Sequence, residues 1–177
     1  FLMTSLRRAE DERQLVRLSY YDTLTGFYNR NRYIRDINRQ AQADGSFGIA
    51  YLDVNGLKDI NDYYGHDYGD QGLASCAQKI RDAFPTGDFY RIGGDEFALI
   101  VSADMDEEQR SRMAERIQTM LSAPIVIEEK VLSVGVSCGC ACYPEDGDAS
   151  QVRIMADSRM YAEKQHHHED DRTEEQS

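Results

Sequence analysis

A short segment near the middle of the sequence, across which the chain must reverse its direction, constrains the fold more than any other feature. Two strand-like runs, at 89–92 and 97–101, are separated only by the sequence GGDE at 93–96. Such a short connection can close a hairpin between antiparallel strands, whereas parallel strands need a crossover of about a dozen or more residues. The two runs are therefore predicted to pair as an antiparallel hairpin with two acidic residues at its turn.

The remaining periodic segments mix strands and helices. The turn-like sequence DTLTG at 22–26 should lead into a helix that ends near Ala43. A hairpin inside such a mixed order predicts an α+β fold, with a mostly antiparallel central sheet flanked by helices, rather than a doubly wound parallel sheet. β-rich apolar runs predict strands at 47–54 and 131–143, and apolar residues three and four apart predict helices at 57–64, 73–84, 113–121 and 152–160.

Composition narrows the class of partner. The 177 residues carry a formal net charge of −12, and nucleic-acid binding rests on basic surface, so we expect no nucleic-acid partner. A nucleotide is compatible with this charge, because magnesium and a single lysine can hold its phosphates. No apolar run approaches the roughly 20 residues that span a bilayer, which favours a cytoplasmic chain. Because the sequence begins with Phe1 rather than Met, we expect a fragment whose missing N-terminal region could tether it to a membrane.

The chain divides into three parts. Residues 1–20 are charged and helix-prone, with apolar residues on a 3-4 spacing that Arg13 interrupts. They are predicted to form a linker helix, either the end of a coiled coil from an upstream sensory domain or a solvated helix. Residues 21–165 contain every strand-like run and are expected to form one folded domain. Residues 166–177 begin with histidines and are rich in acidic residues beyond them, and they are expected to be disordered.

Three cysteines alternate along the predicted strand at 131–143. Cys138, Cys140 and Cys142 would face the same way on a strand. Three ligands at this spacing suit a tetrahedral metal ion poorly, so we favour buried core thiols in a reducing compartment over a metal site.

Two acidic clusters lie where strands end or turn. Asp53 closes the first strand, and Asp95 and Glu96 lie in the hairpin. If the two strands are neighbours, these carboxylates converge, and a cluster of this kind is stabilised by a hard cation such as Mg²⁺. Lys58, one helical turn beyond Asp53, could offer a positive charge to a triphosphate. Glycines 93–94 would let the backbone approach a phosphate, although on these features alone an ordinary structural turn is the favoured interpretation.

Four strings of residues, in order along the chain, carry more weight. DTLTGFYNRNRY, LDVNGLKDINDYYGHDYGD, YRIGGDEFALI and ADSRMYAEK resemble the motifs of GGDEF-domain diguanylate cyclases, from about Asp22 to Lys164. The resemblance implies that 21–165 is a GGDEF catalytic domain with a fold like the nucleotidyl-cyclase core and the polymerase palm. It also implies that two molecules of GTP are condensed into cyclic di-GMP and pyrophosphate, with Mg²⁺ (or Mn²⁺), at a homodimer interface.

The resemblance assigns roles to single residues. Asp95 would accept a proton, Lys58 would stabilise charge on the phosphates, and Glu96 would support a second metal position. The implied metal ligands are Asp53, the backbone carbonyl of Val54, Asp95 and Glu96. The implied substrate-binding residues are Asn61 and Asp70 at the guanine edge, His66 near the base or ribose, Gly93 and Gly94 in the hairpin, and Lys164 at the terminal phosphates.

The sequence departs from the family pattern at several positions. Asn55 replaces a frequent aspartate, with little effect expected. Gln165 and His166 stand where Gly-Arg often follows Lys164, so the phosphate contact of that arginine is not expected here. The family's feedback motif, Arg-x-x-Asp, would fall on Phe84 and Gly87, so that site is expected to be missing. Two other functions remain open: a catalytically silent GTP-binding domain that regulates a partner, and a cyclase with a different dinucleotide product. The retained acids argue against the first, and Asp70 argues against the second.

Overall fold

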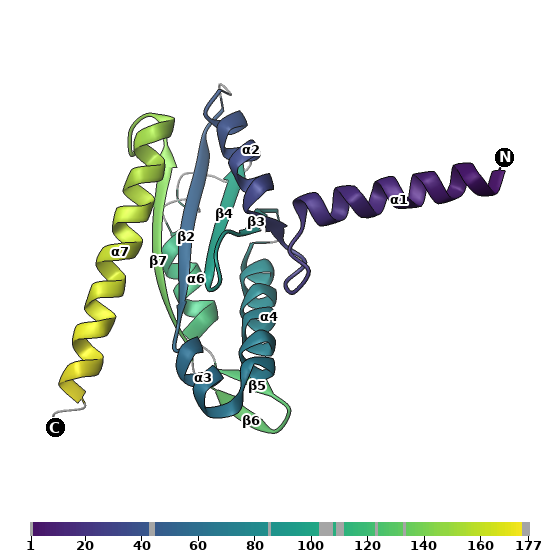
Figure 1. Ribbon diagram of the computed structural model, residues 1–177. Coiled ribbons are helices and arrows are strands. Elements are labelled where there is room, and N and C mark those ends of the chain that lie inside the picture. The colour runs from purple at the N-terminus through teal and green to yellow at the C-terminus, as the bar shows by residue number, and fades with distance from the viewer. Residues whose placement is uncertain are drawn as a thin grey trace.

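A five-stranded sheet forms the centre of the computed structural model, which describes residues 2–42, 45–84, 86–102, 108, 112–122, 124–132 and 134–174 (Figure 1). Each pair of neighbouring strands is antiparallel except the β1–β3 pair at one edge. The mostly antiparallel sheet that the hairpin predicted is therefore confirmed. In spatial order the strands are β1 (Tyr28–Asn29), β3 (Asp88–Arg91), β4 (Glu96–Ser102), β2 (Phe47–Asn55) and β7 (Gly135–Tyr143).

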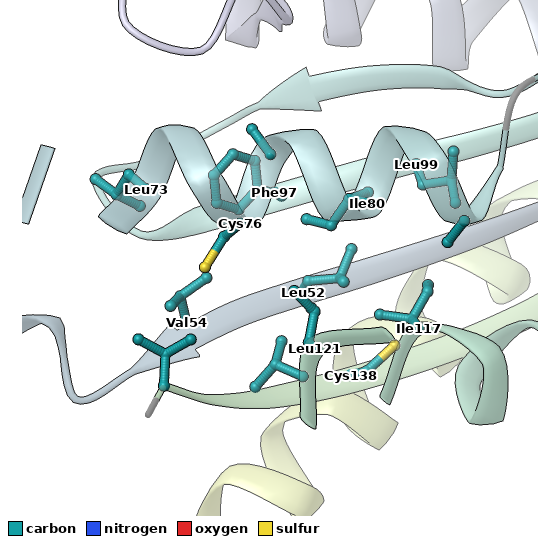
Figure 2. Close-up of a cluster of buried hydrophobic side chains, with 14 of the residues drawn as sticks. Leu52, Val54, Leu73, Cys76, Ile80, Phe97, Leu99, Ile117, Leu121 and Cys138 are labelled. Atoms are coloured by element: carbon teal, nitrogen blue, oxygen red, sulfur yellow. The ribbon is translucent and has the colours of Figure 1, made fainter. Parts of the chain in front are cut away.

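Helices cover both faces of this sheet because its central strands are apolar on both sides. On β2, Leu52 and Val54 belong to one buried cluster, whereas Ile49 and Tyr51 belong to the other. The first cluster packs against α3 (Leu57–Tyr64), α4 (His66–Ala83) and α6 (Met113–Ser122), and Figure 2 shows its centre. The second packs against α2 (Arg30–Gln40) and α7 (Ala149–Glu174).

The N-terminal segment is helical, as predicted. Helix α1 (Leu2–Tyr20) projects away from the sheet (Figure 1). Its apolar side chains Leu15 and Leu18 are 64% and 62% exposed, so α1 contributes little to the core. Within the described residues, no helix combines the length and the apolar character that crossing a membrane requires.

Two sequence-based expectations were wrong. The single strand expected at 131–143 is split into β6 (Lys130–Leu132) and β7, and β6 pairs with β5 (Ile125–Ile127) in a separate two-stranded sheet. The run is β-rich throughout, so local pattern could not show that its two halves have different partners. Residues 166–174, expected to be disordered, continue α7. No glycine or proline interrupts the chain between 149 and 174, so nothing local terminates the helix; 175–177 lie outside the described residues.

The cysteines lie in or beside the core. Cys76, Cys138 and Cys142 are buried, and the sulfur atoms of Cys138 and Cys140 are 3.6 Å apart on the same face of β7. Burial raises the pKa of the Cys76 thiol to about 11. The prediction of buried core thiols is therefore confirmed for Cys138 and Cys142, while Cys140 is only partly buried.

Candidate active site at the hairpin end of the sheet

The two acidic clusters meet because β2 and β4 are neighbours. Asp53 is paired across the strands with Glu96. Side chains alternate along a strand, so both carboxylates belong to the face covered by α2 and α7, opposite Leu52 and Phe97. The backbone N–H of Val54 donates to the carbonyl oxygen of Asp95 at 3.0 Å, which ties the hairpin turn to the end of β2.

Asp53 is a buried carboxylate with a cationic partner. Asp53 is 2% exposed, and the ammonium Nζ of Lys164 lies 2.7 Å from its Oδ2. This hydrogen bond to Asp53 raises the pKa of Lys164 above its ordinary value. Lys164 comes from α7, and in this structure it neutralises the carboxylate that the sequence assigned to a metal.

The oxygen atoms at this end of the sheet suit a hard divalent cation. The carboxylates of Asp53 and Glu96 and the backbone carbonyl of Val54 are oxygen donors of the kind that Mg²⁺ prefers. Among the described residues, no group of three or more His, Cys, Asp or Glu side chains forms a ready-made metal cage. Mg²⁺ commonly binds through one or two carboxylates, with water and substrate phosphates as its other ligands. The residues present therefore fit a magnesium ion that arrives with a triphosphate.

The two hairpin glycines have different reasons to be glycine. A Cβ on Gly93 would lie 2.4 Å from the carboxylate of Glu96, so a side chain there would displace that acid. A Cβ on Gly94 would meet nothing within 4 Å. The turn is closed by the N–H groups of Ile92 and Gly93, which donate to the carbonyl of Glu96 at 2.9 and 3.3 Å. Gly94 is thus the exposed point at which a phosphate could approach the backbone.

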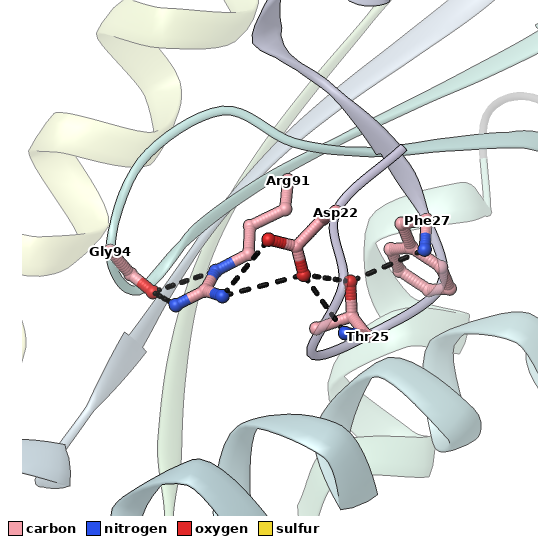
Figure 3. Close-up of polar contacts among 5 residues, drawn as sticks. All are labelled: Asp22, Thr25, Phe27, Arg91 and Gly94. Carbon is pink, nitrogen blue, oxygen red and sulfur yellow. Dashed lines mark hydrogen bonds and ion pairs between the residues drawn. The ribbon is translucent and has the colours of Figure 1, made fainter. Parts of the chain in front are cut away.

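A polar clamp, which sequence reasoning missed, holds the hairpin in place (Figure 3). Arg91 donates from Nη2 to the carbonyl of Gly94 at 2.7 Å and pairs with Asp22 at 3.2 Å. Asp22 also accepts from the backbone N–H and the hydroxyl of Thr25, at 2.8 and 2.7 Å. Burial acts to raise the pKa of Asp22, but the hydrogen bonds from Thr25 and the charge of Arg91 outweigh this effect. The pKa of Asp22 is therefore lowered. The turn sequence DTLTG was the only signal for this contact.

The residues assigned to guanine lie on α3 and α4, which meet at Gly65. Gly65 has φ +91°, and its N–H donates to the carbonyl of Asn61 at 2.9 Å. A Cβ at Gly69 would lie 2.0 Å from the Asn61 side-chain oxygen, so glycine gives that amide its room. Asp70 follows directly on α4 and is exposed, as is His66. The structure therefore brings Asn61 beside the first turns of α4.

Lys58 stands apart from this group. It is exposed on α3, one turn before Asn61.

A groove of about 600 Å³ lies on the face of the sheet opposite α3, between α2 and α7, and its lining includes Tyr51, Arg153 and Glu96. Space for a ligand therefore adjoins the acidic end of the sheet.

The positions of the family's feedback motif are packed into the domain. Phe84 is 3% exposed, and the guanidinium of Arg116 lies 5.2 Å from its ring centroid. A Cβ at Gly87 would lie 2.4 Å from a methyl group of Leu99. Neither position presents a charge or a hydrogen-bonding side chain to a ligand. The nearby Arg81 lies over the ring of Phe27, 5.0 Å from its centroid.

Comparison with known proteins agrees with this geometry. The MucR protein of Pseudomonas aeruginosa, named a bifunctional diguanylate cyclase/cyclic di-GMP phosphodiesterase, is 35% identical over 169 residues, which cover 92% of this chain and 24% of MucR. The diguanylate cyclase TpbB of the same organism is 31% identical over 168 residues, covering 89% of this chain and 38% of TpbB. The chain therefore spans less than half the length of either relative.

A solved structure gives the same result for the fold. The coiled coil and GGDEF domain of DgcB from Caulobacter crescentus, in complex with c-di-GMP, aligns with a TM-score of 0.78 and 26% identity, over 93% of this chain and 90% of that one. The palm-like fold expected from the sequence is thereby confirmed. The family described as "Diguanylate cyclase, GGDEF domain" matches residues 19–170. This chain belongs to the GGDEF-domain family of diguanylate cyclases.

Proposed function

We propose that this chain is an active diguanylate cyclase, which condenses two molecules of GTP into cyclic di-GMP and releases two pyrophosphates. The observation that carries the proposal is the convergence of Asp53, Asp95 and Glu96 at one end of the sheet. A catalytically silent domain has no need to keep all three acids together. Relatives named as diguanylate cyclases, and the DgcB structure in complex with c-di-GMP, support the same reaction class.

Each half-reaction joins one GTP to the other. The 3′-hydroxyl oxygen of one nucleotide attacks the α-phosphate of its partner, a new P–O bond forms, and the bond to the leaving pyrophosphate breaks. Asp95 would accept the hydroxyl proton. Lys58 and Lys164 supply positive charge for the phosphates, which requires Lys164 to leave Asp53. Positioning and electrostatic stabilisation account for most of the catalysis in phosphoryl transfer.

Asp53, Asp95, Glu96 and the carbonyl of Val54 would hold Mg²⁺, or Mn²⁺ in its place. Such an ion, when bound, makes the attacking hydroxyl easier to deprotonate and offsets charge on the leaving group. The chain's own part is to keep these oxygens in register. The β2–β4 pairing and the Val54–Asp95 hydrogen bond serve that purpose.

Guanine selection would rest on α3 and α4. The N1–H and exocyclic amine of guanine are donors, and the Asp70 carboxylate can accept from both, with Asn61 beside it and His66 near the base or ribose. Adenine has an acceptor at N1 and would leave Asp70 without a partner, which disfavours its binding. Because one domain holds one GTP, two domains must face each other, so a homodimer is required and an upstream sensory domain could control its formation.

The test is direct. The protein is incubated with GTP and Mg²⁺, and the products are separated and identified by mass, with pyrophosphate release measured in parallel. We expect cyclic di-GMP from the wild type, no detectable turnover from Asp53→Asn or Asp95→Asn, and wild-type rates from Asp11→Asn, a matched change on the exposed helix α1. GTP binding without pyrophosphate release would indicate a silent domain, and a mixed dinucleotide would indicate a different cyclase. Near-normal rates in either acidic variant would refute the assigned metal ligands.

A further inference from the structure

The β5–β6 hairpin contacts the junction of α3 and α4 through aromatic and charged side chains. The ammonium of Lys130 lies 4.4 Å from the ring centroid of Tyr64 and 4.6 Å from that of Tyr68. The two rings are themselves 5.5 Å apart. The hydroxyl of Tyr68 donates to the carboxylate of Glu128. One tyrosine ends α3 and the other lies in the first turn of α4, so a single lysine contacts both helices.

The hairpin is held in this position by the core. Ile125 and Ile127 of β5 are buried, and a Cβ on Gly72 of α4 would meet Ile125 at 3.5 Å and Ile127 at 3.9 Å. Glycine at 72 therefore lets β5 pack closely against α4. The turn that follows places Glu128 in the left-handed region, with φ +55°. Figure 1 shows β5 and β6 beside the ends of α3 and α4.

This contact lies at the point where a small movement would matter most for the base. Tyr64 and Tyr68 flank Gly65, the only residue between α3 and α4. Asn61 lies one turn before that junction, and Asp70 lies two residues beyond Tyr68. A glycine junction is conformationally permissive, so the angle between the two helices has to be set by contacts made elsewhere.

We propose that Lys130 is a positioning residue for nucleotide selection: by binding the faces of both tyrosines, it fixes the angle between α3 and α4 and hence the relative placement of Asn61 and Asp70. This inference rests on the proposed function, in which those two residues read guanine. Lys130 acts on Asn61 and Asp70 indirectly, by holding the two helices that carry them.

The size of the effect follows from the exposure of the contacts. Lys130 is exposed, and cation–π contacts at exposed sites are individually weak, so losing two of them should change guanine-nucleotide affinity by about three- to tenfold. The arginine guanidinium also binds aromatic faces, which makes Lys130→Arg a conservative variant that keeps the contact.

Titration calorimetry and steady-state kinetics on the whole chain test the proposal with Lys130→Met, Lys130→Arg and the matched control Val131→Thr. Val131 is on the same strand and is 66% exposed, and because successive side chains alternate along a strand, it belongs to the face opposite Lys130. We expect Lys130→Met to raise the Kd and KM for GTP by about three- to tenfold, to lower the preference for GTP over ATP, and to leave kcat nearly unchanged. Lys130→Arg and Val131→Thr should behave as the wild type.

Unchanged GTP affinity in Lys130→Met would overturn the proposal. So would equal weakening of GTP and ATP, or a fall in kcat without a change in KM, because these indicate a general effect on the domain. A wild type that binds GTP but forms no cyclic di-GMP would refute the proposed function alone, since the GTP and ATP titrations still decide the role of Lys130. A wild type that binds neither nucleotide would refute both.

Discussion

Replacing Lys164 by methionine should destabilise the protein without metal and much less with it. Methionine keeps the length and the apolar stem of the side chain but removes the charge that faces Asp53. The carboxylate of Asp53 has a side-chain exposure of only 3%, whereas that of Lys164 is 33%. The variant therefore leaves a buried carboxylate without its cationic partner.

The expected loss can be estimated from these exposures. A hydrogen bond to a charged group contributes roughly 1.5–3 kcal/mol, and a buried charge left without its partner moves the cost toward the upper limit. The partial exposure of Lys164 reduces this cost, because water screens the ammonium, so we expect the free energy of unfolding to fall by about 2 kcal/mol. Because the pKa of Lys164 is raised above 10.5, its contribution is complete below that pH and is lost only as pH rises through the folded-state value.

Urea unfolding at neutral pH, in EDTA and in excess Mg²⁺, measures this effect. We expect the full loss of unfolding free energy for Lys164→Met in EDTA and a smaller loss in Mg²⁺, because a divalent cation can replace the ammonium as the partner of Asp53. Calorimetry should also show tighter Mg²⁺ binding by the nucleotide-free variant, which no longer has a competing cation, but weaker binding of GTP. Lys164→Arg serves as the charge-conserving control.

A double-mutant cycle makes the reasoning refutable. In an Asp53→Asn background, Lys164→Met should cost little, since the amide needs no counter-charge. An equal loss of stability in both backgrounds would show that Lys164 acts through packing. Identical losses in EDTA and in Mg²⁺ would show that the ion and the ammonium do not share Asp53.

Three further outcomes are expected. Asp70→Ala should weaken GTP binding by about 1.5–3 kcal/mol and reduce discrimination against ATP, and unchanged affinity in calorimetry would exclude its contact with guanine. Asp22→Asn should lower the free energy of unfolding by about 1–2 kcal/mol at neutral pH, through the loss of its hydrogen bonds and its pairing with Arg91. Because the pKa of Asp22 lies below its ordinary value of 3.8, the carboxylate contributes this stability above pH 3.8 and loses it as the pH falls through the lowered pKa. The denaturation curves of variant and wild type should therefore converge at low pH. Cyclic di-GMP should inhibit turnover only competitively, because Phe84 and Gly87 offer a ligand no charge, and non-competitive inhibition in initial-rate measurements would contradict this.

Some features of the protein follow from the sequence by itself. The hairpin at 93–96, the strand at 47–54 and the apolar faces of α3 and α4 depend on contacts within a few residues, and alternation or a 3-4 spacing records such contacts directly. The hairpin and the run ending at Asp53 also predicted that two acidic clusters would meet if their strands paired, which they do. Family membership was evident from four short strings.

The tertiary structure alone decided how the site is held together. Lys164 meets Asp53 across 111 positions of the chain, Arg91 meets Asp22 across 69, and Tyr68 meets Glu128 across 60. It also decided that the run at 131–143 divides between two sheets. Periodicity describes which face of an element is apolar, but it contains no information about which distant element covers that face. Pairing between remote side chains is set by how whole helices and strands pack, and only the folded chain specifies that.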